Sequence, residues 1–235
     1  MKVALVGYGK MGKAIEEILL ERGHEIVARL TKKPDYSEVK DADVAIEFSH
    51  PEAAFENIKV LMENRIPTIS GTTGWLDKLA EIKQLNAEKQ NAFLYASNFS
   101  LGVNLFFELN THLAKLMANY PEYTVEIEEI HHTQKLDKPS GTGITLAEQI
   151  IENSTYSHWE SDQKSTENTL PILSKRLENV PGTHTVNYHS EVDDISITHT
   201  AHSRKGFALG AVLAAEWIQG KSGFFSMKDV LSVTI

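Results

Sequence analysis

The chain of 235 residues contains no cysteine. This absence excludes disulfide bonds, thiolate nucleophiles and cysteine-ligated zinc sites. No apolar run approaches the about 20 residues that a membrane-spanning helix needs. The apolar start of the chain is too short and too interrupted by glycine for the core of a signal peptide. We therefore expect a protein of the cytoplasm that has no membrane partner.

Clusters of basic residues are also missing. The formal net charge is -9, whereas binding to nucleic acid requires grouped lysines and arginines. We therefore expect no nucleic-acid partner. Hydrophobic residues make up 41% of the chain, which is enough for the core of one large domain or two small ones.

The first hundred residues alternate short apolar runs with amphipathic segments. The expected strands are 2–6, 25–30, 43–48, 68–70 and 93–96, and the expected helices are 11–22, 51–64 and 76–90. Strands connected by helices form βαβ units, which require parallel pairing. The order predicts an α/β fold with an N-terminal doubly wound parallel sheet of the Rossmann type.

The pattern changes after residue 101. Helices are expected at 104–117, 142–153 and 207–218, and alternating strands at 123–131, 172–177, 184–190 and 194–201, with a polar loop at 154–168. The segments predict a second, α+β domain over residues 102–204. The last helix is expected to return to the first domain, which then comprises residues 1–101 and 205–235.

A glycine-rich turn joins the first expected strand to the first expected helix. It has the pattern G-x-G-x-x-G and consists of Gly7, Tyr8, Gly9, Lys10, Met11 and Gly12. Its glycines permit a tight turn, close approach of a pyrophosphate and close helix packing, and the helix N-terminus attracts phosphate. The turn predicts dinucleotide binding; the alternative is a glycine turn that binds nothing.

The acidic residue that binds the adenosine ribose of NAD is absent. It is expected about 20 positions after the turn, where the chain has Arg29, Thr31, Lys32 and Lys33 instead. Cations suit the 2′-phosphate of NADPH, so we predict that NADPH is preferred over NADH and that Lys32 contacts the cofactor. The alternative is that these cations are ordinary solvated loop residues.

A second group of chemically active residues lies at 131–142, in the segment HHTQKLDKPSGT. It combines two histidines, the cation Lys135 and a Ser-Gly-Thr start to a helix. Histidine and lysine can transfer protons, and a helix start can bind a carboxylate. The segment predicts the active site of a reductase that acts on a small dicarboxylate. Taken singly, Ser140 or Thr142 could instead be only a helix cap.

The sequence resembles the dihydrodipicolinate reductase family. The resemblance is carried by E-x-H-H-x-x-K-x-D-x-P-S-G-T at 129–142, GYGKMG at 7–12, VAIEFSHP at 44–51, GTTG at 71–74, ASNFSLGVN at 96–104 and SRKGFALGA at 203–211. It implies reduction of 4-hydroxy-tetrahydrodipicolinate in lysine and diaminopimelate biosynthesis. It also implies a homotetramer with a Rossmann domain and a substrate-binding and tetramerisation domain.

The resemblance also implies roles for individual residues. His131 corresponds to the family's catalytic acid/base and Lys135 to its second proton donor. The substrate contacts correspond to His132, Lys135, Ser140, Gly141 and Thr142. The contacts to the nicotinamide side of the cofactor correspond to Gly71, Thr72, Thr73, Ala96, Ser97, Asn98 and Phe99. Arg204 corresponds to a family arginine near the domain junction, and its role stays open.

The chain departs from the family pattern in the short segment 31–41 and in Lys138 and Gly143, where alanine is usual. Two other functions fit the glycine turn alone: another Rossmann dehydrogenase of amino-acid metabolism, and a nucleotide-sensing binding protein. Neither would require the segment at 131–142. A metal site built from His184, His189, His199 and His202 lacks an acidic ligand and a shared strand face, so we expect no metal.

Overall fold

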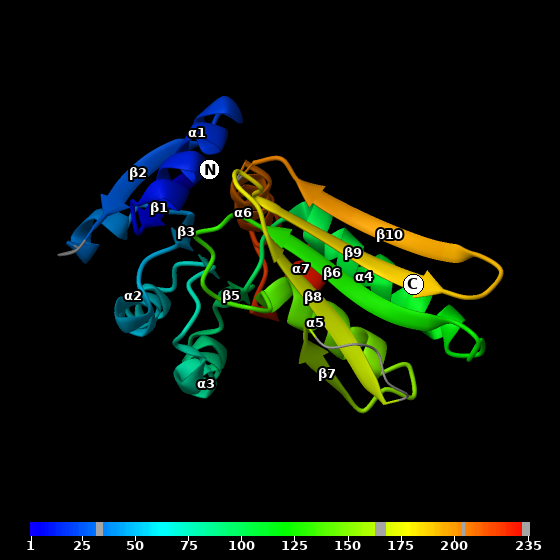
Figure 1. The fold of residues 1–235 in the computed structure, drawn as a ribbon. Helices are drawn as coiled ribbons and strands as arrows, with labels where there is room; N and C mark the ends of the chain where they lie inside the picture. The colour runs from blue at the N-terminus through cyan, green and yellow to red at the C-terminus, as the bar shows by residue number, and fades with distance from the viewer. Residues whose placement is uncertain (32–34, 163–167, 204, 232–235) are drawn as a thin grey trace. The chain divides into compact units, whose positions relative to one another are not determined.

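The computed structural model describes residues 1–31, 35–162, 168–203 and 205–231 (Figure 1). The chain forms two compact units. Unit 1 comprises Met1–Leu101 and Lys205–Ile235, and unit 2 comprises Gly102–Arg204. Among the described residues, no helix has both the length and the apolar character to cross a membrane.

Unit 1 contains a six-stranded sheet in the order β11-β5-β4-β3-β1-β2, in which every strand pair is parallel. The strands are β1 (Lys2–Val6), β2 (Glu25–Leu30), β3 (Val44–Glu47), β4 (Thr68–Ser70), β5 (Ala92–Tyr95) and β11 (Gly223–Phe225). The helices are α1 (Lys10–Glu21), α2 (Pro51–Glu63), α3 (Leu79–Lys89), α6 (Lys205–Trp217) and α7 (Met227–Leu231), with short 3-10 turns at Tyr36–Val39 and Leu76–Lys78.

Successive residues of β1 face opposite sides of this sheet, as strand geometry requires. Leu5 belongs to a buried cluster with residues of α1 and α6, such as Ile15 and Val212. Its neighbour Val6 belongs to a different cluster, with Leu61 of α2. Helices therefore cover both faces, and the predicted doubly wound α/β fold is confirmed.

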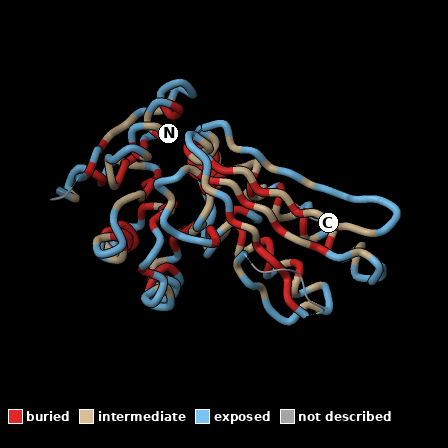
Figure 2. The backbone as a smooth tube through the Cα atoms, in the orientation of Figure 1, coloured by how far each residue is buried: buried red, intermediate tan, exposed pale blue. Residues whose placement is uncertain are grey.

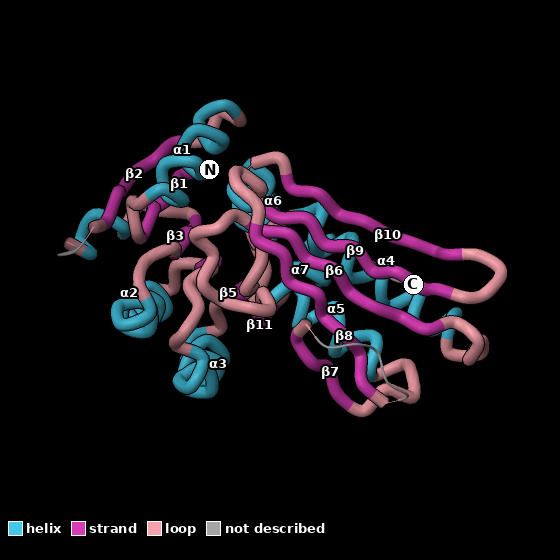
Figure 3. The backbone as a smooth tube through the Cα atoms, in the orientation of Figure 1, coloured by secondary structure: helices cyan, strands magenta, loops and turns pink. Residues whose placement is uncertain are grey.

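Unit 2 contains a five-stranded mixed sheet in the order β10-β9-β6-β8-β7. Its strands are β6 (Thr124–His131), β7 (His158–Ser161), β8 (Thr169–Arg176), β9 (Gly182–His189) and β10 (Asp194–Ala201), and its helices are α4 (Leu101–Met117) and α5 (Gly141–Ile151). The strand β6 pairs antiparallel with β9 and parallel with β8. This sheet with two long helices is the expected α+β unit (Figure 3).

One face of the unit 2 sheet is packed against both helices. Phe106 of α4 and Leu146 of α5 are buried in one cluster with Ile127 of β6 and Val186 of β9. The edge strand β10, in contrast, consists only of exposed and half-buried residues (Figure 2). The face of β6 that packs against α4 and α5 is therefore buried. The functional side chains of β6 described below project from this face.

Two strands differ from the sequence-based expectation. The segment 154–168 was expected to be a loop, yet β7 lies within it, and β11 was not expected at all. Both are short edge strands of at most four residues. Such short segments do not show enough of a two-residue alternation to be distinguished from loops.

Candidate active site

The glycine turn of unit 1 is closely packed. Gly7 has a φ of +94°, and a Cβ added there would lie 2.0 Å from the carbonyl oxygen of Phe48. A Cβ added at Gly12 would lie 2.4 Å from the carbonyl oxygen of Gly7. No atom lies within 4 Å of a Cβ added at Gly9. Two glycines therefore close the turn, and the third leaves its backbone open to a ligand.

A cavity of about 620 Å³ lies beside this turn, within the about 300–1,000 Å³ usual for small-molecule sites. Among the predicted cofactor residues, the cavity is lined by Gly7, Tyr8, Gly9, Lys10, Met11, Gly71, Thr72 and Thr73. The lining residues that were not predicted as contacts include Phe48, Ser49, His50 and Asn57. They belong to or follow the block VAIEFSHP, whose position at the carboxyl end of β3 could have identified them.

The start of α1 suits a phosphate group. Gly9 is the N-cap, no side chain caps the helix, and its first turn contains no acidic residue. The first backbone N–H groups of a helix lack partners within the helix and carry partial positive charge. The cavity, the open backbone at Gly9 and this uncapped helix start fit the pyrophosphate of a dinucleotide.

The remaining predicted cofactor residues lie outside the cavity lining. Gly12 supports the turn. Ala96, Ser97, Asn98 and Phe99 follow β5, where the backbone N–H of Ala96 donates to Ser70 at the end of β4 at 3.2 Å. The ring of Phe99 packs against that of Phe48, with centroids 5.5 Å apart. Lys32, Lys33 and Arg204 lie outside the described residues.

A buried carboxylate organises the loops beside the cavity. Glu47, at the end of β3, has no exposed surface. It accepts hydrogen bonds from the backbone and hydroxyl of Ser49, from Ser70 at 2.7 Å and from Thr72 at 2.9 Å. The hydroxyl of Thr72 also accepts the backbone N–H of Ser49 at 2.9 Å. Glu47 thus fixes the predicted cofactor residue Thr72 relative to the loop after β3.

Arg29 is paired within unit 1. Its Nε lies 2.9 Å from a carboxylate oxygen of Glu16 on α1, and the hydroxyl of Tyr8 donates to the same carboxylate. The guanidinium also lies 6.0 Å from the centroid of the Tyr8 ring. The positive charge expected near the cofactor ribose is therefore partly offset by Glu16, a residue that the sequence did not single out.

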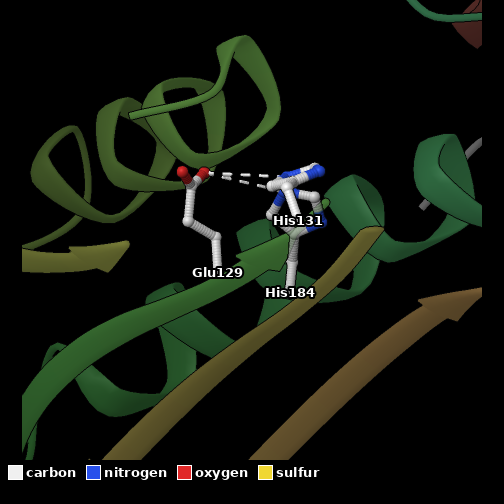
Figure 4. A group of neighbouring side chains, drawn as sticks. All are labelled: Glu129, His131 and His184. Carbon is white, nitrogen blue, oxygen red and sulfur yellow. Dashed lines mark hydrogen bonds and ion pairs between the residues drawn. The ribbon is translucent and has the colours of Figure 1, made fainter. Parts of the chain in front are cut away.

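The second group of predicted residues meets at the end of β6. Glu129 and His131 are two residues apart, so both project from the buried face of that strand, and His184 lies opposite Glu129 on β9. Figure 4 shows the two imidazole rings together beside the Glu129 carboxylate. The Nε2 atoms of His131 and His184 are 3.2 Å apart, and each is within 4.0 Å of Glu129.

Ser140 connects this cluster to α5. It is the N-cap, and its hydroxyl accepts the backbone N–H of Gly143 at 3.1 Å. Its own backbone N–H donates to both carboxylate oxygens of Glu129, and its hydroxyl lies 3.1 Å from Nε2 of His184. The predicted substrate residue Ser140 therefore has a structural role as a helix cap.

Burial and charge set the protonation of the cluster. Burial would raise the pKa of Glu129, but hydrogen bonds from Ser140 and Ser174 outweigh it, so the pKa is lowered. Burial lowers the pKa of His131, although Glu129 opposes this. Burial and the charge of His131 lower the pKa of His184 to about 3. At neutral pH the cluster contains one carboxylate and two neutral imidazoles.

The remaining predicted site residues of unit 2 differ in their burial and in their contacts. Lys135 pairs with Asp137 at 2.8 Å. The adjacent His132 is half-buried, and among the described residues its Nδ1 has no hydrogen-bond partner. Gly141 is exposed, and a Cβ added there would meet no atom within 4 Å. Thr142 is half-buried in the first turn of α5. Gly141 thus presents open backbone at the start of α5, and the charge of Lys135 acts on both His131 and His184.

Glu129, His131 and His184 are also spaced as metal ligands could be, with their ligand atoms within 4.8 Å of one another. They form the one such group in the part of the chain that the structure describes. The carboxylate of Glu129 already accepts Ser140, Ser174 at 2.9 Å and Arg176 at 3.4 Å. This arrangement satisfies the carboxylate without an ion, and the absence of a metal stays a prediction.

Two family models match the chain in succession. The model described as dihydrodipicolinate reductase, N-terminus, matches residues 1–99, and the model described as dihydrodipicolinate reductase, C-terminus, matches residues 102–231. The chain belongs to the dihydrodipicolinate reductase family. The family resemblance expected from the sequence is confirmed, and the nucleotide-sensing alternative is set aside.

Relatives within this family are similar over nearly the whole chain. The 4-hydroxy-tetrahydrodipicolinate reductase of Christiangramia forsetii is 56% identical, covering 99% of this chain and 98% of its own. The enzyme of the same name from Archaeoglobus fulgidus is 37% identical, covering 97% and 83%. A dipicolinate-bound dihydrodipicolinate reductase from Paenisporosarcina sp. TG-14 has the same fold, with a TM-score of 0.79 at 24% identity over 97% and 98% of the chains.

Two residues of the cluster were not predicted as members of the site. Glu129 was noticed only as part of the family motif, and His184 only as a rejected metal ligand. Both lie on strands in which alternate residues are buried, with Val125 and Ile127 preceding Glu129, and Val186 and Tyr188 following His184. Polar residues continuing an apolar strand face are the signal that could have identified them.

Proposed function

We propose that the chain catalyses the NAD(P)H-dependent reduction of 4-hydroxy-tetrahydrodipicolinate to tetrahydrodipicolinate, in lysine and diaminopimelate biosynthesis. The observation that carries the proposal is the 56% identity with a reductase of that name over 99% of the chain. The clustering of the histidine, lysine and helix-cap residues in unit 2 supports it. The substrate is accordingly a small cyclic dicarboxylate.

Unit 1 would bind the cofactor. When bound, a reduced nicotinamide would supply the hydride. The open backbone at Gly9 and the start of α1 would hold the pyrophosphate. The nicotinamide side would contact Gly71, Thr72 and Thr73 after β4 and Ala96, Ser97, Asn98 and Phe99 after β5. Glu47 would keep the first of these loops in place.

Unit 2 would bind the substrate and supply the proton. Gly141, Thr142 and His132 would bind carboxylate, together with Lys135. Because burial keeps His131 neutral at neutral pH, Lys135 is the better proton donor before substrate binds. A dicarboxylate would add negative charge near His131 and favour its protonated form, so that His131 can then act as an acid.

We also propose that NADPH is preferred over NADH. The support is the lack of an acidic residue at the end of β2 and the presence of Arg29, whose charge could pair with a 2′-phosphate. Glu16 competes for that arginine. The preference therefore depends on whether the phosphate displaces this contact.

The test is oxidation of NADPH by the purified chain, with the substrate generated by dihydrodipicolinate synthase in the same cuvette. We expect loss of NADPH absorbance that requires the synthase. The matched control is a chain with His131→Gln, which should be folded and far slower. An equal rate without the synthase, or no rate above background, would contradict the proposal. Size-exclusion chromatography with light scattering tests the homotetramer, and a location in the cytoplasm likewise stays a prediction.

A further inference from the structure

His184 occupies an unusual place for a buried histidine. Its side chain is 5% exposed, and its Nε2 faces two polar groups at once. One is Nε2 of His131 at 3.2 Å, and the other is the hydroxyl of Ser140 at 3.1 Å. The single nitrogen therefore connects the proposed acid/base His131 to the cap of the helix proposed to bind substrate.

The contact between the two imidazole rings links the protonation of one ring to that of the other. A hydrogen bond between two ring nitrogens requires one to donate and the other to accept, so the tautomer of each ring depends on the other. The Ser140 hydroxyl accepts the backbone N–H of Gly143 at 3.1 Å, and its own proton is available for a hydrogen bond to His184. Nε2 of His184 has a single lone pair, so its hydrogen bond to His131 and its hydrogen bond to Ser140 depend on one another.

Burial is the main reason that His184 stays neutral, and the neighbouring charges act on the two rings in both directions. Glu129 and His131 face His184 from β6, His199 faces it from β10, and Lys135 acts from the loop after β6. Arg176 of β8 acts on His131 in addition. The pKa of His184 is lowered to about 3, so His184 stays neutral while His131 gains or loses a proton.

We propose that His184 is a positioning residue, which holds Nε2 of His131 in one hydrogen-bonded orientation and couples it to the Ser140 cap. His184 itself contacts no reacting atom in this role. The kinetic part of the inference rests on the proposed function, whereas the coupling between the two rings does not.

Two variants separate the hydrogen bond from the packing. His184→Leu has similar bulk and no polar atom, whereas His184→Gln places an amide near the position of Nε2. We expect kcat of His184→Leu to fall about 10–100-fold, the loss usual when the partner that orients a metal-bound histidine is removed, with little change in KM. His184→Gln should restore most of that loss.

A second measurement does not depend on activity. Long-range ¹H–¹⁵N spectra of ¹⁵N-histidine-labelled protein report the tautomer and titration of each ring. Because His184→Leu removes an acceptor for the protonated ring, His131 should titrate at lower pH in that variant than in the wild type, and His184→Gln should lie between them.

The outcomes are distinguishable. If His131 keeps its tautomer and titration in His184→Leu, the inference is wrong. It is also wrong if both variants keep full activity, or if both lose activity and thermal stability equally while the spectra of His131 are unchanged. If the wild type does not oxidise NADPH but the spectra change as expected, the proposed function fails and the coupling stands.

Discussion

The carboxylate of Glu129 accepts the backbone N–H of Ser140 through both of its oxygens, at 3.1 and 2.9 Å. Glu129 lies on β6 and Ser140 begins α5, so this contact fixes the helix start to the sheet. It also orients the hydroxyl of Ser140 toward His184. The position of α5, and with it the proposed carboxylate-binding backbone, therefore depends on one fully buried acid.

Replacement of Glu129 should destabilise the protein. In Glu129→Leu the backbone N–H of Ser140 and the hydroxyl of Ser174 lose their acceptor, at a cost of about 1–3 kcal/mol for each buried donor left unpaired. Glu129→Gln keeps one acceptor oxygen and should lose less. Urea unfolding of the three proteins measures the difference. Equal stability of Glu129→Leu and wild type would show that the contact is not maintained in solution.

The two proposed proton-transfer residues should be necessary for turnover. We expect His131→Gln and Lys135→Met each to lower kcat by about 10²–10⁴-fold, the usual contribution of a positioned acid or base. Lys138→Met is the matched control, since Lys138 pairs with Asp162 at 2.6 Å and is 44% exposed. If either active-site variant retains wild-type kcat, the corresponding role is wrong.

Cofactor preference should respond to Glu16 and Arg29 in opposite directions. Arg29→Met should lower the ratio of kcat/KM for NADPH to that for NADH by about tenfold, because a charge-assisted hydrogen bond contributes about 1.5–3 kcal/mol. Glu16→Gln releases the guanidinium and should raise the ratio. Steady-state kinetics with both cofactors measures it. A wild-type preference for NADH that neither variant alters would refute a role for Arg29 in this preference.

Stability should fall with acid because of His184. Its folded pKa of about 3 lies below the ordinary 6.5, so between these values the unfolded chain binds a proton that the folded chain does not. Stability is thus complete above the unfolded pKa and decreases as pH falls, by on the order of 3 kcal/mol from about pH 7 to about pH 4.

Urea midpoints measured across this pH range test that slope. The slope should be shallower in His184→Leu. The matched control is His189→Gln, because a hydrogen bond to the carboxylate of Asp194 raises the pKa of the half-buried His189. Removing His189 should make the slope slightly steeper. A wild-type slope that His184→Leu does not change would contradict the assignment.

Much of the fold follows from local patterns. The expected strands 2–6, 25–30, 68–70 and 194–201 have the bounds of β1, β2, β4 and β10. Gly23, just after the end of the first helix, has a φ of +78°, the conformation that favours glycine at such a position. Periodicity and glycine position are properties of neighbouring residues, so a single sequence is enough to detect them.

The rest depends on contacts between distant parts of the chain. His184 meets His131 across 53 positions, and no local pattern reports that β9 pairs with β6. Arg29 contacts Glu16 because β2 lies beside α1 in the fold. From the sequence alone Arg29 looks like an unpaired cation, whereas in the structure it is paired. Pairing of this kind decides charge and protonation, the properties on which the proposed chemistry depends.

Unit 1 is built from two stretches separated by all of unit 2. The core around Ile15 includes Ala211 and Val212 of α6, and β11 completes the sheet beside β5. During synthesis, the ribosome makes every residue of unit 2 before it makes these parts. Unit 2 can therefore fold first on the nascent chain, while the sheet face that α1 and α6 cover together stays partly exposed until α6 emerges.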